Sequence, residues 1–210
     1  MSIHFFLTET EAVQTVLQWV EDALKRDIQQ RGEASLVLTG GKSVQPFLTA
    51  LAALPIAWSQ VWIVLSDERW LPVDQAASNE KQLKTLFLDK LRQKPRYISL
   101  KTDHTTPFDA IPSLKTTLSV IPMPITMSLL SMGEDGHIAS LFPKEPWGEG
   151  LTHCFKNGNH RISLSLDFLK RCNHNVLLVK KERKSLFETI RQNRDGTQAI
   201  DYLDVNTVVY

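Results

Sequence analysis

The stretch SLVLTGGKS at residues 35–43 decides the fold class of this 210-residue chain. Its first five residues are mostly apolar and predict a buried strand, and Gly40 and Gly41 predict a tight turn directly after that strand. Residues 44–54 return to a helical pattern. A strand that leads through a short turn into a helix is typical of a βαβ unit, so this stretch predicts an α/β protein.

The same alternation of strand and helix extends in both directions from this stretch. Before it, Thr8 and Glu11 form a capping-box pattern, and apolar residues at helical spacing continue to Gly32. After it, strands are predicted over residues 61–65, 96–100, 125–130, 161–166 and 175–179, and helices around residues 79–91, 107–120 and 186–190, with Asn79 as a helix cap. This pattern predicts one domain, residues 1–210, with a Rossmann-like, doubly wound, mainly parallel sheet and helices on both faces.

The composition excludes several classes of protein. The formal net charge is +1 and no basic run stands out, so a nucleic-acid partner is not expected. No apolar run approaches the roughly 20 residues that a membrane span requires, and the first residues lack the regions of a signal peptide. We therefore expect a cytoplasmic protein without a membrane partner, either a monomer or a weak homodimer. Cys154 and Cys172 are expected to be free thiols.

Polar clusters follow three of the predicted strands. They occupy residues 40–43, 67–69 and 133–137. In open parallel sheets, ligands bind in the crevice beyond the carboxyl ends of the strands. Three unusual clusters at three such ends therefore predict one shared binding site.

The first cluster has the composition of an anion site. Gly40 and Gly41 can turn backbone N–H groups toward an anion at a helix start, and Lys42 and Ser43 supply further donors. An ordinary strand-to-helix turn explains two glycines taken alone equally well. The letters GKS also end the nucleotide-binding P-loop motif, but that motif requires glycine where Leu36 stands. A nucleoside triphosphatase is therefore disfavoured.

The third cluster, Gly133-Glu134-Asp135-Gly136-His137, predicts a histidine presented by a tight turn. A histidine titrates near neutral pH, which suits a general base, and Asp135 is placed to hold its imidazole in one tautomer. A surface or capping histidine is the alternative for an isolated residue. Metal binding is not expected, because His153 and His160 form only a weak pair. Taken alone, Asp67 and Arg69 of the second cluster also fit a solvated salt bridge.

With these clusters in this order, the chain resembles the 6-phosphogluconolactonase family. The segment at residues 133–143 matches the family signature Gly-x-Asp-Gly-His-x-Ala-Ser-Leu-Phe-Pro completely, and residues 67–72 with Ser78-Asn79 match Asp-Glu-Arg-Trp-x-Pro and Ser-Asn. Residues 39–44 resemble the family's Ser-Gly-Gly-Ser-Thr-Pro turn, in which Lys42 and Val44 are departures. Arg161 and Lys184 stand at the positions of a family arginine and a family lysine. Related isomerases and deaminases have Asp-Glu-Tyr and Ala-Phe-Asn instead, which favours the lactonase.

The resemblance implies hydrolysis of 6-phospho-D-glucono-1,5-lactone to 6-phospho-D-gluconate, a step of the oxidative pentose phosphate pathway, without metal or cofactor. His137 would activate the water, the backbone N–H groups of the Gly133 turn and Arg69 would stabilise the oxyanion, and Asp67 and Asp135 would orient groups. The phosphate would bind to Gly40, Gly41, Lys42, Ser43, Arg161 and Lys184. An amino-sugar-phosphate isomerase or deaminase, and a sugar-phosphate-binding protein without catalysis, remain the alternatives.

Overall fold

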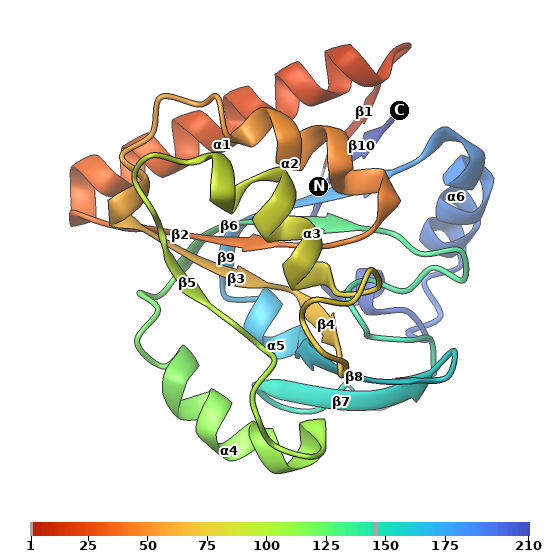
Figure 1. The fold of residues 1–210 in the computed structure, drawn as a ribbon. Coiled ribbons are helices and arrows are strands. Elements are labelled where there is room, and N and C mark those ends of the chain that lie inside the picture. Colours follow the sequence, from red (N-terminus) through yellow and green to blue (C-terminus); the bar gives the residue numbers. More distant parts are fainter. Residues whose placement is uncertain (1, 145–146) are drawn as a thin grey trace.

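The computed structural model describes residues 2–144 and 147–210 as an α/β fold in layers (Figure 1). Its central sheet has seven strands in the order β1-β10-β9-β6-β2-β3-β5, and every neighbouring pair is parallel. The strands are β1 (Ile3–Phe5), β2 (Ala34–Leu38), β3 (Val61–Leu65), β5 (Arg96–Ile98), β6 (Ile125–Ser131), β9 (Cys172–Val179) and β10 (Asn206–Val209). The predicted fold class is confirmed.

Helices flank this sheet (Figure 1). On one face lie α1 (Glu9–Arg31), α2 (Gln45–Leu51) and α3 (Asn79–Leu86), and toward the other lie α4 (Pro107–Leu118) and α5 (Leu166–Leu169). The helix α6 (Lys184–Asn193) follows β9. Short 3-10 helices connect these elements: η1 (Lys42–Val44), η2 (Trp58–Gln60), η3 (Leu88–Lys90), η4 (Lys181–Arg183) and η5 (Ala199–Tyr202). None of the described helices is both long enough and apolar enough to cross a membrane.

A second, antiparallel sheet lies below the first in Figure 1. It consists of β4 (Asp67–Arg69), β8 (Asn159–Leu164) and β7 (Leu151–Lys156), with β8 in the middle. The sequence predicts a strand at residues 161–166 but not the separate antiparallel sheet in which it lies. β8 pairs with β4 and β7, both antiparallel. β4 and β7 are not predicted, because a three-residue charged strand and a half-exposed edge strand carry no clear apolar period.

The helix boundaries follow local capping chemistry. The capping box of Thr8 and Glu11 is present at the start of α1, and Gly32 ends that helix in the left-handed conformation (φ 79°). The predicted cap at Asn79 is wrong by one residue, because the hydroxyl of Ser78 accepts the N–H of Lys81 and makes Ser78 the N-cap of α3. The side chain of Asn79 is thereby free to serve the site described next.

Candidate active site

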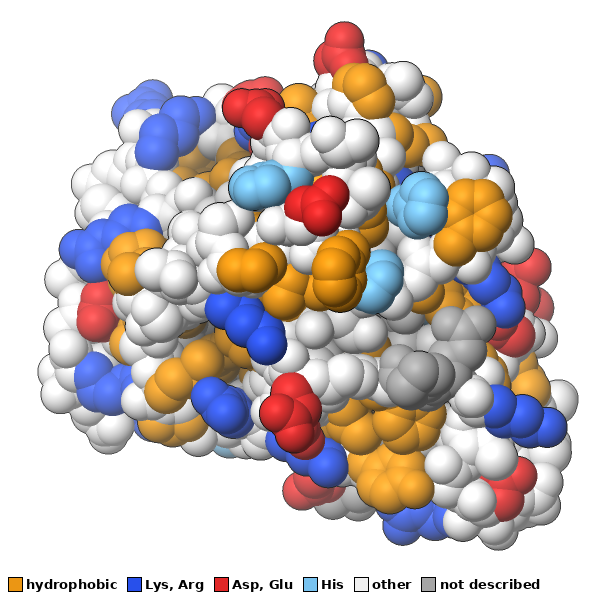
Figure 2. Space-filling view, turned by 90° about the horizontal axis from the view of Figure 1, so that it is seen from below, with side chains coloured by type: hydrophobic (Ala, Val, Ile, Leu, Met, Phe, Trp, Pro, Cys, Tyr) orange, Lys and Arg blue, Asp and Glu red, His pale blue; other side chains and the backbone are white. Residues whose placement is uncertain are grey.

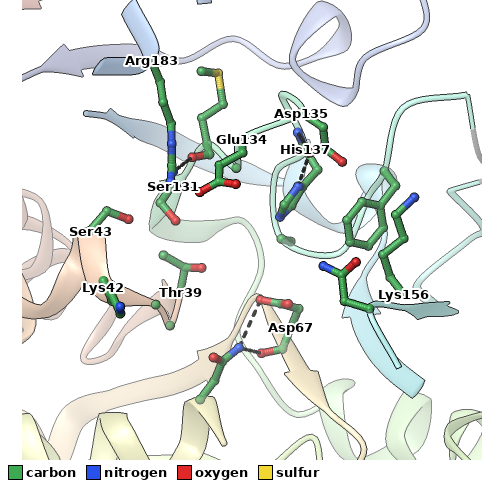
Figure 3. Close-up of a pocket in the computed structure, with 18 of the residues that line it drawn as sticks. Thr39, Lys42, Ser43, Asp67, Ser131, Glu134, Asp135, His137, Lys156 and Arg183 are labelled. Atoms are coloured by element: carbon green, nitrogen blue, oxygen red, sulfur yellow. Dashed lines mark hydrogen bonds and ion pairs between the residues drawn. The ribbon is translucent and has the colours of Figure 1, made fainter. Parts of the chain in front are cut away.

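One pocket of about 660 Å³ joins the three polar clusters. It lies beyond the carboxyl ends of β2, β3 and β6, where the chain leaves the central sheet. The predicted residues that line it are Gly40, Gly41, Lys42, Ser43, Asp67, Arg69, Asp135, His137 and Arg161. In Figure 3 the ring of His137 lies between the first turn, residues 40–43, and Lys156 of β7.

The imidazole of His137 is oriented by Asp135, two residues before it. Nδ1 of His137 is hydrogen-bonded to Oδ1 of Asp135, and the backbone N–H of His137 donates to the same oxygen over 3.2 Å (Figure 3). A carboxylate only accepts hydrogen bonds, so Nδ1 carries the proton and Nε2 keeps its lone pair. Burial raises the pKa of Asp135, but the bonds from His137 outweigh this effect and hold that pKa below its ordinary value. Nε2 is therefore left as a proton acceptor.

The histidine loop, residues 133–141, closes on itself around this side chain. The N–H of Gly133 donates to the carbonyl of His137 (2.8 Å), and the N–H of Gly136 donates to the carbonyl of Gly133 (3.2 Å). The expectation that the amides of this turn face an oxyanion is therefore not met for these two, since both are occupied. A Cβ on Gly133 would lie 2.0 Å from Cε1 of His137, so the ring fills the space that any other side chain would need.

The end of the histidine loop is fastened to the second sheet. The hydroxyl of Ser140 donates to Oδ2 of Asp67 over 2.6 Å, and the N–H of Ser140 donates to Oγ of Ser163 over 3.2 Å. Ala139, just before it, has a φ of 55° and lies in the left-handed region that non-glycine residues rarely adopt. Strain of this kind persists only where the surroundings fix the backbone, which the two bonds of Ser140 do here.

Alternation along the second sheet divides its side chains between two faces. Asp67 and Arg69 of β4 share one face with the residues opposite them on β8, Ser163 and Arg161. Asp67, Arg69 and Arg161 of this face line the pocket. Glu68 lies between Asp67 and Arg69 and therefore belongs to the other face. The Asp-Glu-Arg cluster thus supplies two pocket residues rather than three.

Two arginines of the pocket face carry donors without a partner. Nε of Arg69 and Nε of Arg161 are buried and have no hydrogen-bond acceptor among the described residues. Nη1 of Arg69 donates to the carbonyl of Ala77 (2.6 Å), and Nη1 of Arg161 lies 3.8 Å from Oδ2 of Asp67. Burial lowers the pKa of Arg161, Asp67 opposes this change, and the charge of Arg69 adds to it. Two neighbouring cations whose buried Nε donors are unmet favour an anionic ligand.

The carboxylate of Glu68 connects β4, which contributes to the pocket lining, to the N-terminus of α3. This carboxylate accepts the N–H of Asn79 (2.8 Å), the N–H of Glu80 (2.7 Å) and the hydroxyl of Ser78 (3.0 Å). An acidic group at a helix N-terminus satisfies amides that have no partner inside the helix. Burial nevertheless raises the pKa of Glu68 above its ordinary value, although these bonds oppose the change. The position of α3 therefore follows that of β4.

From α3, two side chains reach the first turn. Oε1 of Gln82 accepts the N–H of Gly41 and Nε2 of Gln82 donates to the carbonyl of Gly41, each over 2.8 Å. A Cβ on Gly40 would lie 2.2 Å from Oδ1 of Asn79, so only glycine fits there. The expectation that the Gly41 amide faces an anion is not met, because Gln82 occupies it. Lys42 and Ser43 open η1, and their amides have no acceptor inside that helix.

Lys184 lies away from the pocket, contrary to the expectation. Its Nζ lies 4.6 Å from the centre of the Phe5 ring and 3.6 Å from Oε1 of Glu188, and it is not among the residues that line the pocket. Lys180 and Arg183 line it instead. The basic run KKERK at residues 180–184 marks the region, but which of its members face the pocket depends on where α6 begins.

Arg183 also touches the histidine loop. Its Nη1 donates to the carbonyl of Met132 over 2.6 Å, and its Nη2 lies 3.5 Å from Oε1 of Glu134 (Figure 3). Other pocket residues include Ser131, Lys156 and Asn157, which the sequence did not single out. They stand at strand ends or in a hairpin turn, and no motif distinguishes them.

His153 and His160, the two histidines in the strands of the second sheet, lie on the face of that sheet opposite the pocket. Figure 2 views the molecule from the side of α4 and shows histidine and hydrophobic side chains next to one another. His153 stacks against Phe108 with ring centroids 5.4 Å apart, and His160 stacks against Phe155 at 4.8 Å. No group of three or more metal-ligating side chains occurs in residues 2–144 and 147–210. His153 and His160 thus pack against aromatic rings, away from the pocket.

Proteins of known sequence resemble this chain over most of its length. Residues 7–200 match the family described as glucosamine-6-phosphate isomerases/6-phosphogluconolactonase. The chain belongs to this family. A member from Pseudomonas putida, a 6-phosphogluconolactonase, is 36% identical over 146 residues, which make up 70% of this chain and only 60% of that protein. A 6-phosphogluconolactonase of Xylella fastidiosa strain 9a5c is 34% identical and is aligned over 91% of this chain and 84% of its own.

A solved structure from the family has the same fold. The crystal structure of a 6-phosphogluconolactonase from Shewanella baltica OS155 superimposes with a TM-score of 0.91 at 25% sequence identity. The superposition covers 100% of this chain and 96% of the Shewanella chain. Both the parallel sheet and the antiparallel sheet that walls the pocket are therefore features of a fold found in this family.

Proposed function

We propose that this protein hydrolyses 6-phospho-D-glucono-1,5-lactone to 6-phospho-D-gluconate. The observation that carries the proposal is the pair of His137 and Asp135 in a pocket whose lining includes the cations Lys42, Lys156, Arg161, Lys180 and Arg183. In Figure 3, Lys42 and Arg183 lie on one side of His137 and Lys156 lies on the other. The relatives in Pseudomonas, Xylella and Shewanella are 6-phosphogluconolactonases, which supports the same reaction.

The first step is attack by water on the lactone carbonyl. Nε2 of His137 takes a proton from the water while the water oxygen bonds to carbon 1, and the carbonyl electron pair moves onto oxygen. The unmet Nε donor of Arg69 stabilises the resulting oxyanion. Asp135 stabilises the imidazolium through Nδ1 and keeps the ring oriented.

The second step opens the ring. The bond between carbon 1 and the ring oxygen breaks, and that oxygen takes the proton from Nε2 of His137. The product is a hydroxy acid, whose carboxyl group then loses its proton to solvent. His137 returns to its neutral form, so the cycle needs no further reactant.

The phosphate group binds at the first turn in this proposal. Ser43 and Lys42 supply donors there, and Arg161 lines the same pocket from the second sheet. Lys180 and Arg183 take the place that the sequence assigns to Lys184, since they line the pocket and Lys184 does not. Asp67 orients Ser140 and Arg161 and does not react.

The decisive test follows the loss of freshly prepared lactone against its spontaneous hydrolysis, with and without a chelator. We expect faster hydrolysis with protein, no effect of the chelator, and a much lower kcat/KM for unphosphorylated gluconolactone. Equal kcat/KM for the two lactones would contradict the phosphate site. Release of ammonia from glucosamine 6-phosphate would favour the deaminase alternative, and binding of the lactone without turnover would favour a binding protein.

A further inference from the structure

Two side chains outside the pocket hold the first turn, one at Gly41 and the other at Ser43. Gln82 of α3 contacts Gly41, and Tyr210, after β10, contacts Ser43. Neither Gln82 nor Tyr210 is among the residues that line the pocket. They therefore act on the turn without reaching a ligand bound inside.

Gln82 fixes both hydrogen-bonding groups of one glycine. Its amide accepts the N–H of Gly41 and donates to the carbonyl of Gly41, each over 2.8 Å. Gly41 has a φ of 102° and a ψ of 170°, a conformation open almost only to glycine. Glycine has no side chain of its own to hold the backbone there. The orientation of the peptide before Lys42 thus depends on Gln82.

Tyr210 holds the other end of the turn. Its hydroxyl donates to the carbonyl of Ser43 over 2.5 Å, and its ring packs edge-on against Phe47 at 5.3 Å between centroids. Burial raises the pKa of Tyr210 well above its ordinary value, so the hydroxyl keeps its proton. The backbone carbonyl of Tyr210 accepts the N–H of Lys181 (2.6 Å), the residue after the pocket residue Lys180. Tyr210 therefore joins the first turn to the basic segment that faces it.

We propose that Gln82 and Tyr210 are positioning residues that set the preference for phosphorylated over unphosphorylated lactones. This rests on the proposed function, in which the first turn binds the phosphate. Through the carbonyls of Gly41 and Ser43, the two residues fix the backbone on either side of the Lys42 and Ser43 amides that receive the anion. Their side-chain hydrogen bonds go to the first turn and not to the histidine loop, so they act on substrate affinity rather than on the chemical step.

The test compares Gln82→Met and Tyr210→Phe with two matched controls. Gln60→Met removes a glutamine bond to the carbonyl of Gly32, and Tyr202→Phe removes a tyrosine bond to the carbonyl of Gly196. Each control loses the same kind of bond, to a glycine carbonyl away from the pocket. All four proteins are first compared by thermal unfolding, and Gln82→Ala replaces Gln82→Met if that variant does not fold.

We expect KM for the phosphorylated lactone to rise about fivefold to tenfold in Gln82→Met and in Tyr210→Phe, the effect of roughly one hydrogen bond. The kcat should stay within about twofold, and the kinetics on unphosphorylated gluconolactone should not change. Both controls should behave like the wild-type protein. An equal loss on both lactones, or no change in KM, would overturn the proposal.

A second measurement separates this inference from the proposed function. Binding of inorganic phosphate to each protein is measured by calorimetry, without any lactone. Weaker phosphate binding in Gln82→Met and Tyr210→Phe than in Gln60→Met and Tyr202→Phe supports the positioning role even if no lactone is hydrolysed. Equal binding in all variants, or no binding by the wild-type protein, overturns it.

Discussion

The histidine loop holds its functional side chain by contacts over a few residues, whereas the first turn is held by residues distant in the chain. Asp135 orients His137 from two positions away, and Gly133 packs against the ring from four positions away. In the first turn, Gly41 is bonded to Gln82 and Ser43 to Tyr210, at separations of 41 and 167 residues. Both turns line the same pocket.

This difference indicates that the two turns contribute to different kinetic parameters. A general base must be placed within a fraction of an ångström of the reacting atoms, and short contacts within one loop give that precision. An anion site tolerates more variation, because several donors share the charge. Damage to the histidine loop should therefore reduce kcat, while damage to the first turn should raise KM. Four substitutions test this division.

The largest effect is expected at His137. His137→Asn should keep the fold and lower kcat by roughly 10²–10⁴-fold, because the only proposed proton acceptor is removed. Steady-state kinetics on the phosphorylated lactone measure the loss, and circular dichroism checks the fold. A kcat near the wild-type value would remove His137 from the role of base.

Gly133→Ala should come next. The new Cβ would lie 2.0 Å from Cε1 of His137, so the ring must move, and a displacement of about 1 Å can cost about 10²-fold in rate. The loss should appear in kcat, with KM nearly unchanged. Gly32→Ala is the control, since a Cβ there meets no atom within 4 Å and only backbone strain is added. Equal kcat in both variants would show that the ring tolerates the contact.

Asp135→Asn should lower kcat/KM by about 10- to 100-fold, less than the ~10⁴ that a triad aspartate contributes, because the Asp135 side chain is 46% exposed. The pKa of Asp135 lies below its ordinary value, so its carboxylate persists in acid. A group with a lowered pKa stabilises its partner at every pH above that pKa, so the advantage of the wild-type protein over the variant should persist below 3.8, the ordinary pKa of an aspartate. Asparagine carries no charge at any pH, which makes Asp135→Asn the reference for this comparison. A ratio of wild-type to variant kcat/KM that already falls to one at the ordinary pKa of an aspartate would separate Asp135 from His137.

The smallest effect is expected at Gly40. Its Cβ in Gly40→Ala would lie 2.2 Å from Oδ1 and 2.7 Å from Cβ of Asn79, so the first turn must move away from α3. We expect KM for the phosphorylated lactone to rise about tenfold, equivalent to about 1.4 kcal/mol of binding free energy, with kcat retained. A fall in kcat like that of Gly133→Ala would erase the distinction between the two turns.

The difference between local and long-range contacts also explains which parts of the structure the sequence could predict. His137 and Asp135 were predicted because their relation lies within one short motif. The central sheet was predicted because buried parallel strands are continuous apolar runs. The contacts of Gln82 and Tyr210 with the first turn leave no local signal, since they depend on where α3 and β10 lie in space. Lys184 is assigned to the phosphate by the family resemblance alone, and no local pattern shows that its side chain packs against Phe5 and Glu188 instead.

In the second sheet, the number of residues before Asp67 decides which side chains of β4 face the pocket. Asp67 and Arg69 line the pocket while Glu68 caps α3, because neighbouring residues of β4 point to opposite faces. Inserting one residue before Asp67 would turn Glu68 into the pocket and both pocket residues out of it. Evolution can therefore vary this wall by substitution but not by single insertions within β4. The turn at Asn157 and Gly158, between β7 and β8, is under no such restriction, and new loops that reshape the pocket mouth can arise there.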